Sequence, residues 1–173
     1  MIALPTESTA YDEKILQCIV NFLEDIGIKV IDQKLDGPCI LPGLSITANA
    51  ILLDKARLKH PGDLLHEAGH LAVTPKDQRA LIGSANMDLN WPSAGDEIAA
   101  ILWSYAAICY LKIAPDVVFH TEGYKNESKW LIEQFENGNY IGLPLLEWMG
   151  LCHSGNNIKE TIPVFPNMIK WLR

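Results

Sequence analysis

The sequence lacks any long uninterrupted run of apolar residues, although 49% of its 173 residues are hydrophobic. A helix that crosses a bilayer needs about 20 apolar residues in succession, so we expect no membrane-spanning segment. The first residues, Met1 to Glu7, also lack the positive start and the apolar block of a secretory signal. These absences favour a cytoplasmic protein without a membrane partner.

Clusters of positive charge are missing as well. The chain has 14 Lys and Arg residues against 21 Asp and Glu residues, which gives a formal net charge of −7 at pH 7. Because binding to a phosphate backbone requires grouped Lys and Arg side chains, we expect no nucleic-acid partner.

The four cysteines show no paired Cys-x-x-Cys spacing. Cys18, Cys39, Cys109 and Cys152 lie far apart along the chain, each among apolar neighbours. We therefore expect buried free thiols, and neither disulfide bonds nor a thiolate zinc site.

The composition that remains is that of a globular protein, and the length fits a single domain, residues 1–173. Apolar residues recur at helical spacing from 9 to 26, and nearly every position from Glu97 to Ile113 is apolar. The second segment is predicted to be the central buried helix. Shorter helices are expected at 128–135, 143–151 and, as a last turn, 168–172.

A small sheet is predicted before the chemically informative part of the chain. Alternating apolar residues at 28–31 and 44–53 indicate short strands. A short helix should follow, with Asp63 as its N-cap and its end before Pro75. Residues 76–95 are polar and are expected to form a long loop with at most a short strand. The predicted fold class is therefore α+β, mostly helical.

The motif His66-Glu67-Ala68-Gly69-His70 combines residue types and spacing that dictate a chemistry. Four residues make slightly more than one helical turn, so His66 and His70 project from the same face and can share one metal ion. Glu67 lies between them in sequence, close enough to reach a water on that metal. The His-Glu-x-x-His arrangement predicts a zinc site with Glu67 as the general base.

Catalytic zinc generally takes three protein ligands, so a third ligand must come from elsewhere. A histidine six residues after His70 would complete a metzincin site, but Lys76 stands there, which excludes that class. Glu97 is favoured because a carboxylate in an otherwise apolar helix needs a partner. Asp96 and Asp88 remain alternatives, since spacing alone does not rank carboxylates, although Asp96 suits a role at the helix N-terminus better.

These two helices, with His66-Glu67-x-x-His70 followed by Glu97, resemble the gluzincin metallopeptidases, especially the short intracellular bacterial kinds. The resemblance covers residues 44–110. It implies a minimal zincin-like domain in which His66, His70 and Glu97 hold zinc and Glu67 polarises a water. It also implies that the upstream strand region lines the substrate cleft.

The resemblance further implies a reaction. Zinc would lower the pKa of its bound water towards about 7, Glu67 would take the proton, and the resulting hydroxide would attack a carbonyl polarised by the metal. Peptidases of this class often add a His or Tyr donor that stabilises the oxyanion. His153, in a polar stretch after an apolar turn, is our first choice, with His120, Tyr105 and Tyr110 as alternatives.

The leading hypothesis is a zinc-dependent hydrolase, a gluzincin-like metallopeptidase that acts on a peptide or protein. The competing hypothesis is a non-catalytic zincin-like binding module that uses the metal structurally or not at all. The high apolar content would suit a partner surface or a homo-oligomer in that case. Glu67 favours the enzyme, because a purely structural site has no need of a base.

Overall fold

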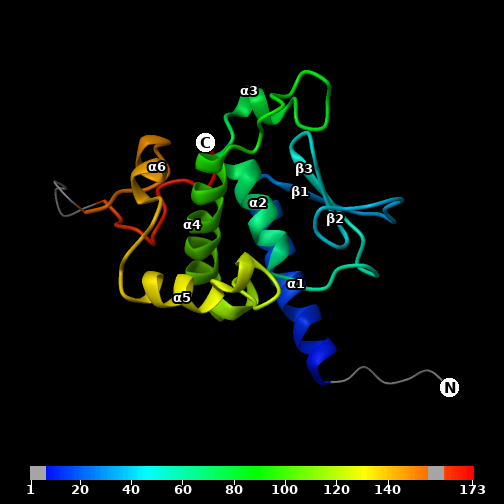
Figure 1. Cartoon of the computed structure of the whole chain (residues 1–173), viewed down its shortest axis with the longest axis horizontal. Helices are drawn as coiled ribbons and strands as arrows, with labels where there is room; N and C mark the ends of the chain where they lie inside the picture. Colours follow the sequence, from blue (N-terminus) through cyan, green and yellow to red (C-terminus); the bar gives the residue numbers. More distant parts are fainter. Residues whose placement is uncertain (1–6, 156–161) are drawn as a thin grey trace.

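Two adjacent helices form the centre of the molecule in the computed structural model, which describes residues 7–155 and 162–173 (Figure 1). Helix α2 spans Asp63–Val73 and helix α4 spans Ala94–Leu111, and the two pack along each other. Helix α1, Glu7–Asp25, packs against α2 and against the first strand. The site described below lies between α2, α4 and the sheet.

The sheet has three short strands: β1 (Lys29–Asp32), β2 (Leu44–Thr47) and β3 (Ala50–Leu53). Their order is β1-β3-β2, with β1 parallel and β2 antiparallel to β3. The tight hairpin between β2 and β3 contains Asn49 at a φ of 56°, a left-handed conformation that asparagine tolerates well. Strand β2 is therefore an edge of the sheet, and it contacts α2.

Smaller elements surround this centre. They are α3 (Lys76–Arg79), the 3-10 turns η1 (Pro115–Val117) and η2 (Tyr124–Asn126), α5 (Ser128–Glu136) and α6 (Leu143–Trp148). Helices and a small sheet together confirm the predicted α+β class. Within the described ranges, none of the helices has the length and apolar character that crossing a bilayer requires.

One apolar core connects the helices and the sheet. Fully buried side chains come from α1, from the inner face of the sheet, from α2 and α4, and from the segments after α4. The largest of them are Trp103, Phe119, Phe135, Ile19, Leu23, Ile28, Ile51, Leu53, Leu64, Leu65, Leu71 and Leu102. As predicted, α4 is the buried central helix, and its residues are almost all apolar.

The ends of the two central helices differ from their predicted ends. Helix α4 starts earlier, at Ala94, because Ser93 and Asp96 form a capping box in which each side chain accepts the other's backbone N–H. It ends at Leu111, before Lys112 at a φ of 56°. The prediction that Asp63 is the N-cap of α2 is wrong. Gly62 holds that position, and Asp63 is the first helical residue.

Other expectations also need correction. Residues 76–95 begin with α3 and end with the first two residues of α4, and residues 80–93 between them form turns and bends without a strand. The expected helical turn at 168–172 is absent, and the segment contains bends instead. Its hydrogen bonds go to other parts of the chain: the backbone N–H of Ile169 donates to the carbonyl of Leu151, and the indole of Trp103 donates to the carbonyl of Trp171. The expectation for the N-terminal segment falls largely on residues 1–6, outside the described residues.

All four cysteines are free thiols, as predicted. Only Cys152 is buried, however, while Cys39 is half-buried and Cys18 and Cys109 are exposed. Cys18 lies on the solvent face of α1 and Cys109 near the exposed end of α4, so apolar sequence neighbours did not predict burial at these positions.

Candidate metal centre

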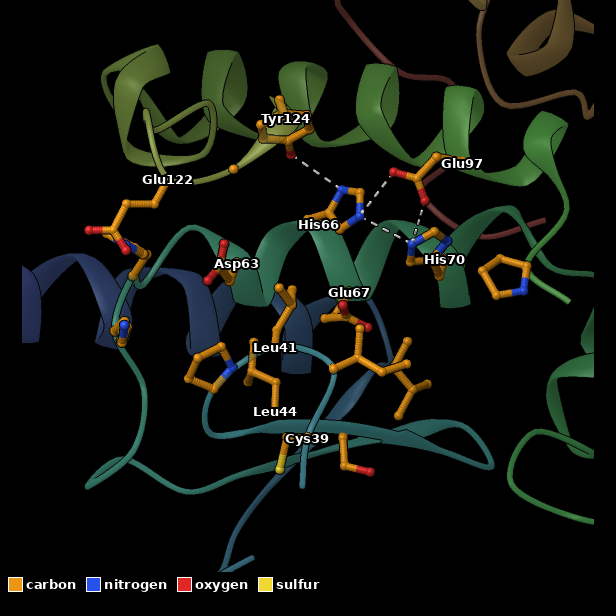
Figure 2. Close-up of a pocket in the computed structure, with 18 of the residues that line it drawn as sticks. Cys39, Leu41, Leu44, Asp63, His66, Glu67, His70, Glu97, Glu122 and Tyr124 are labelled. Atoms are coloured by element: carbon orange, nitrogen blue, oxygen red, sulfur yellow. Dashed lines mark hydrogen bonds and ion pairs between the residues drawn. The ribbon is translucent and has the colours of Figure 1, made fainter. Parts of the chain in front are cut away.

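Three side chains from the two central helices meet at one point (Figure 2). The Nε2 atoms of His66 and His70 lie 3.2 Å apart. Glu97 places its Oε1 3.4 Å from His66 Nε2 and its Oε2 3.3 Å from His70 Nε2. Ligand atoms of one tetrahedral zinc ion with bonds of about 2.0–2.2 Å lie about 3.4 Å apart. The spacing of these donors therefore fits a single metal ion.

The ionisation of His66 and Glu97 suits metal binding. Burial lowers the pKa of His66 to about 4, and the neighbouring His70 adds to the effect. His66 is thus neutral at physiological pH and keeps a nitrogen lone pair. Hydrogen bonding to His70 lowers the pKa of Glu97, against the opposing effect of burial, so Glu97 is a carboxylate. Neutral imidazoles and a carboxylate are the forms that bind metals.

The fold brings these residues together through the close approach of α2 and α4. Gly69 faces α4, and a Cβ atom there would lie 2.8 Å from the carbonyl oxygen of Ala100. Asp96 is held by Ser93 in the capping box, which leaves Glu97 as the carboxylate of this turn that faces α2. The structure therefore favours Glu97 over both alternatives, since Asp88 is exposed and accepts a hydrogen bond from the backbone of Asn90.

The cluster lines a cavity of about 770 Å³ between α2, strand β2 and the loops around them. Glu67 lines the same cavity, and Figure 2 shows it beside the ligand cluster on the side of α2 that faces β2. Burial raises the pKa of Glu67 to about 7, although His70 opposes the rise. A carboxyl group with a pKa near neutrality can both accept and return a proton.

Tyr124, the first residue of η2, was not predicted from the sequence. Its hydroxyl lies 3.3 Å from Nδ1 of His66, and it lines the cavity. Burial raises the pKa of Tyr124, so the hydroxyl keeps its proton. With Nε2 of His66 on a metal, Nδ1 carries the proton and donates to the Tyr124 oxygen, a partner that fixes the ring. No local pattern points to this residue, because 58 positions separate it from its partner.

A second group of side chains lies in the same cavity, at the start of α2. His120 Nε2 lies 2.8 Å from Asp63 Oδ1, and His60 Nε2 lies 3.3 Å from Glu122 Oε2. The two imidazole rings stack with centroids 3.7 Å apart. The hydroxyl of Ser128 donates to the backbone carbonyl of His120 and so fixes the backbone at this residue. These contacts tie the loop that carries Tyr124 to the first turn of α2.

The structure does not bring His153, the expected oxyanion donor, to the cluster. His153 does not line the cavity; it follows α6, which packs on α4, and its carbonyl accepts the backbone N–H of Phe165. The two alternative tyrosines also lie elsewhere: Tyr105 packs on Phe135, and the exposed Tyr110 packs on Phe22. Of the alternatives, only His120 lines the cavity.

Comparisons of the chain with models of protein families, with curated proteins and with solved structures found no match.

Proposed function

We propose that the protein is a zinc-dependent hydrolase that cleaves peptide bonds, with His66, His70 and Glu97 as metal ligands. The observation that carries this proposal is the cluster of three donors, spaced for one ion, on the wall of a cavity that also holds Glu67. Among the described residues the cluster contains three donors, the number that catalytic zinc sites use, whereas structural zinc sites use four.

The residues of the chain have defined roles in this proposal. A zinc ion, when bound, supplies an activated water and polarises the substrate carbonyl. Glu67 accepts the proton of the attacking water and returns it to the leaving amine. Tyr124, whose hydroxyl lies beside Nδ1 of His66, accepts the Nδ1 proton in a hydrogen bond and holds the ring with Nε2 directed at the metal.

The position of the sheet supports a peptide as the substrate. Strand β2 is an edge strand, and its residues Leu44, Ser45 and Ile46 line the cavity opposite the histidines. An edge strand pairs with an extended chain through main-chain hydrogen bonds, which are independent of the side chains of that chain. A peptide bound along β2 would pass the ligand cluster and Glu67.

The metal assignment is tested by zinc content after purification without chelator. We expect one zinc per chain in the wild type and a large loss in His70→Ala and in Glu97→Gln. Asp96→Asn is the matched control, because Asp96 is the adjacent carboxylate but serves the helix cap. Equal zinc in the wild type and in His70→Ala would disprove the site.

The chemistry is tested with zinc-loaded protein and a mixed peptide library. We expect the wild type to hydrolyse peptides and Glu67→Gln to bind zinc but lose activity by two orders of magnitude or more, the typical contribution of a general base. If both are inert while zinc stays bound, the competing hypothesis of a non-catalytic binding module replaces this one.

A further inference from the structure

The C-terminal end of α2, which carries His70, is held by groups from outside the helix. The last four carbonyls of a helix have no partner within it. The buried hydroxyl of Thr74, the residue after α2, donates to the carbonyl of His70 at 2.6 Å. The backbone N–H of Arg173 donates to the carbonyl of Ala72 at 2.9 Å. The backbone at His70 is therefore fixed by the residue that follows the helix and by a segment far away in sequence.

Trp91 makes a second contact with the same hydroxyl. Its indole Nε1 donates to Oγ1 of Thr74 at 3.0 Å. A threonine hydroxyl has one proton to donate and lone pairs to accept with, so Thr74 can bond to both neighbours at once. Trp91 also lies two residues before Ser93, the N-cap of α4, and Glu97 lies in the first turn of that helix. Trp91 thus joins the end of α2 that carries His70 to the start of α4 that carries Glu97.

The indole ring of Trp91 packs against the imidazole of His70. The ring centroids lie 6.2 Å apart, and the planes are inclined by 71°. This edge-to-face arrangement falls in the distance range of favourable aromatic pairs. Trp91 also lines the cavity next to the ligand cluster. The indole therefore contacts a metal ligand directly and is itself held by Thr74.

The two ligand histidines differ in what holds the ring nitrogen outside the cluster. Nδ1 of His66 lies 3.3 Å from the hydroxyl of Tyr124. Nδ1 of His70 is buried and has no hydrogen-bond partner among the described residues. Ligand histidines usually have such a partner, which fixes the orientation of the ring. For His70, the orientation has to come from the packing of neighbouring rings on a fixed backbone.

We propose that Trp91 is the positioning residue of His70. Thr74 holds the indole, and the indole holds the imidazole so that its Nε2 stays beside the carboxylate of Glu97. This inference rests on the proposed metal site. Trp91 and Thr74 restrict the rotation of a ligand without being ligands, so their loss should weaken metal binding while all three donors remain.

The test measures zinc affinity by competition with a chelator. Trp91→Phe keeps an aromatic ring and removes the indole N–H, while Thr74→Val keeps the shape of the side chain and removes the hydroxyl. Each should weaken zinc binding about tenfold, the lower end of the effect of losing a partner of a ligand histidine. Thr74→Ser retains the hydroxyl and should stay within about twofold of the wild type.

Trp103→Phe is the matched control. The indole of Trp103 also donates a hydrogen bond, to the carbonyl of Trp171 at 3.0 Å, but this residue does not line the cavity. The substitution should lower the Tm and leave zinc affinity within about twofold of the wild type. Cobalt(II) is the second probe, because its visible absorption depends on the number and geometry of its ligands. The spectrum should change in Trp91→Phe and match the wild type in Trp103→Phe.

The other outcomes each contradict a defined statement. Wild-type zinc affinity in Trp91→Phe, or equal losses in Trp91→Phe and Trp103→Phe, would overturn the positioning role and leave the metal site standing. A loss in Thr74→Ser as large as in Thr74→Val would show that the hydroxyl does not hold the indole, and it would overturn the role in the same way. Failure of the wild type to bind zinc would overturn the metal site itself.

Discussion

The missing side chain of Gly69 sets how closely α2 approaches α4. A Cβ atom at this position would lie 2.8 Å from the carbonyl oxygen of Ala100 and 3.1 Å from its Cα and Cβ, so the backbone of one helix would have to move. We expect Gly69→Ala to lower the free energy of unfolding by about 1–3 kcal/mol, as overpacking does. The shift should also separate Glu97 from His70 and weaken zinc binding. Denaturant unfolding and competition with a chelator measure the two effects.

Gly95→Ala is the control for this substitution. Gly95 also lies in a central helix, but a Cβ atom there would meet only the hydroxyl of Ser93, at 3.7 Å. Replacing a helical glycine by alanine where there is space stabilises a protein by about 1 kcal/mol or less. Zinc affinity should not change. If Gly69→Ala behaved in the same way, the close helix contact would not be what holds the ligands together.

How much of the site the sequence predicts depends on whether its residues are neighbours in sequence. His66 and His70 share a helix, so helical geometry alone places them together. Glu97 was favoured from the sequence, but Asp96 and Asp88 stayed open as alternatives, because the choice depends on which carboxylate the capping box uses. Tyr124 could not be found, since only the tertiary fold brings its loop to α2.

The stacked rings of His60 and His120 hold the loop that carries Tyr124 against the start of α2. We expect His60→Ala to remove the stack, loosen the loop and weaken zinc affinity about tenfold, the lower end of the effect of losing a partner of a ligand histidine. Tyr124→Phe should have a similar effect, because it removes the hydroxyl beside His66. Chelator competition measures zinc affinity in each variant.

The double variant decides whether the loop acts through Tyr124. If the loop acts through Tyr124, the double variant of His60→Ala and Tyr124→Phe should have the same zinc affinity as the single variant that binds zinc less tightly, because both changes remove the same interaction. Additive losses would contradict the fastening role. His153→Ala is the control, since His153 is a histidine outside the cavity, and its zinc affinity should equal that of the wild type.

Element prediction succeeded where one periodic pattern extends over several turns. The apolar spacing of α1 and the nearly continuous apolar residues of α4 indicated both helices, since such long patterns have few alternative explanations. The short α3, only Lys76–Arg79, has no comparable pattern. The N-cap of α2 was misplaced because Asp63 is a common capping residue, yet its carboxylate pairs with His120, which lies 57 positions away.

At the scale of the whole molecule, the ligand cluster joins the two helices on which the core is built. Zinc bound there would bind the folded chain and not the unfolded chain, so it should stabilise the protein by mass action. At a free zinc concentration of about 100 times the Kd, the gain is about 2.7 kcal/mol. For a domain of this size each kcal/mol raises the Tm by about 2–4 °C, so removal of zinc should lower the Tm by roughly 5–11 °C.

Calorimetry with and without a chelator, on the wild type and two variants, separates this linkage from general effects on stability. Glu97→Gln should show little or no zinc-dependent change in Tm, because it lacks the third ligand. Asp96→Asn should have a lower Tm both with and without zinc, because weakening the helix cap lowers the free energy of unfolding by about 1 kcal/mol. It should nevertheless keep the full zinc-dependent shift in Tm. A zinc-dependent shift of equal size in Glu97→Gln would mean that the stabilising metal binds elsewhere. Loss of the shift in Asp96→Asn as well would mean that zinc binding depends on the integrity of the first turn of α4 and not on Glu97 alone.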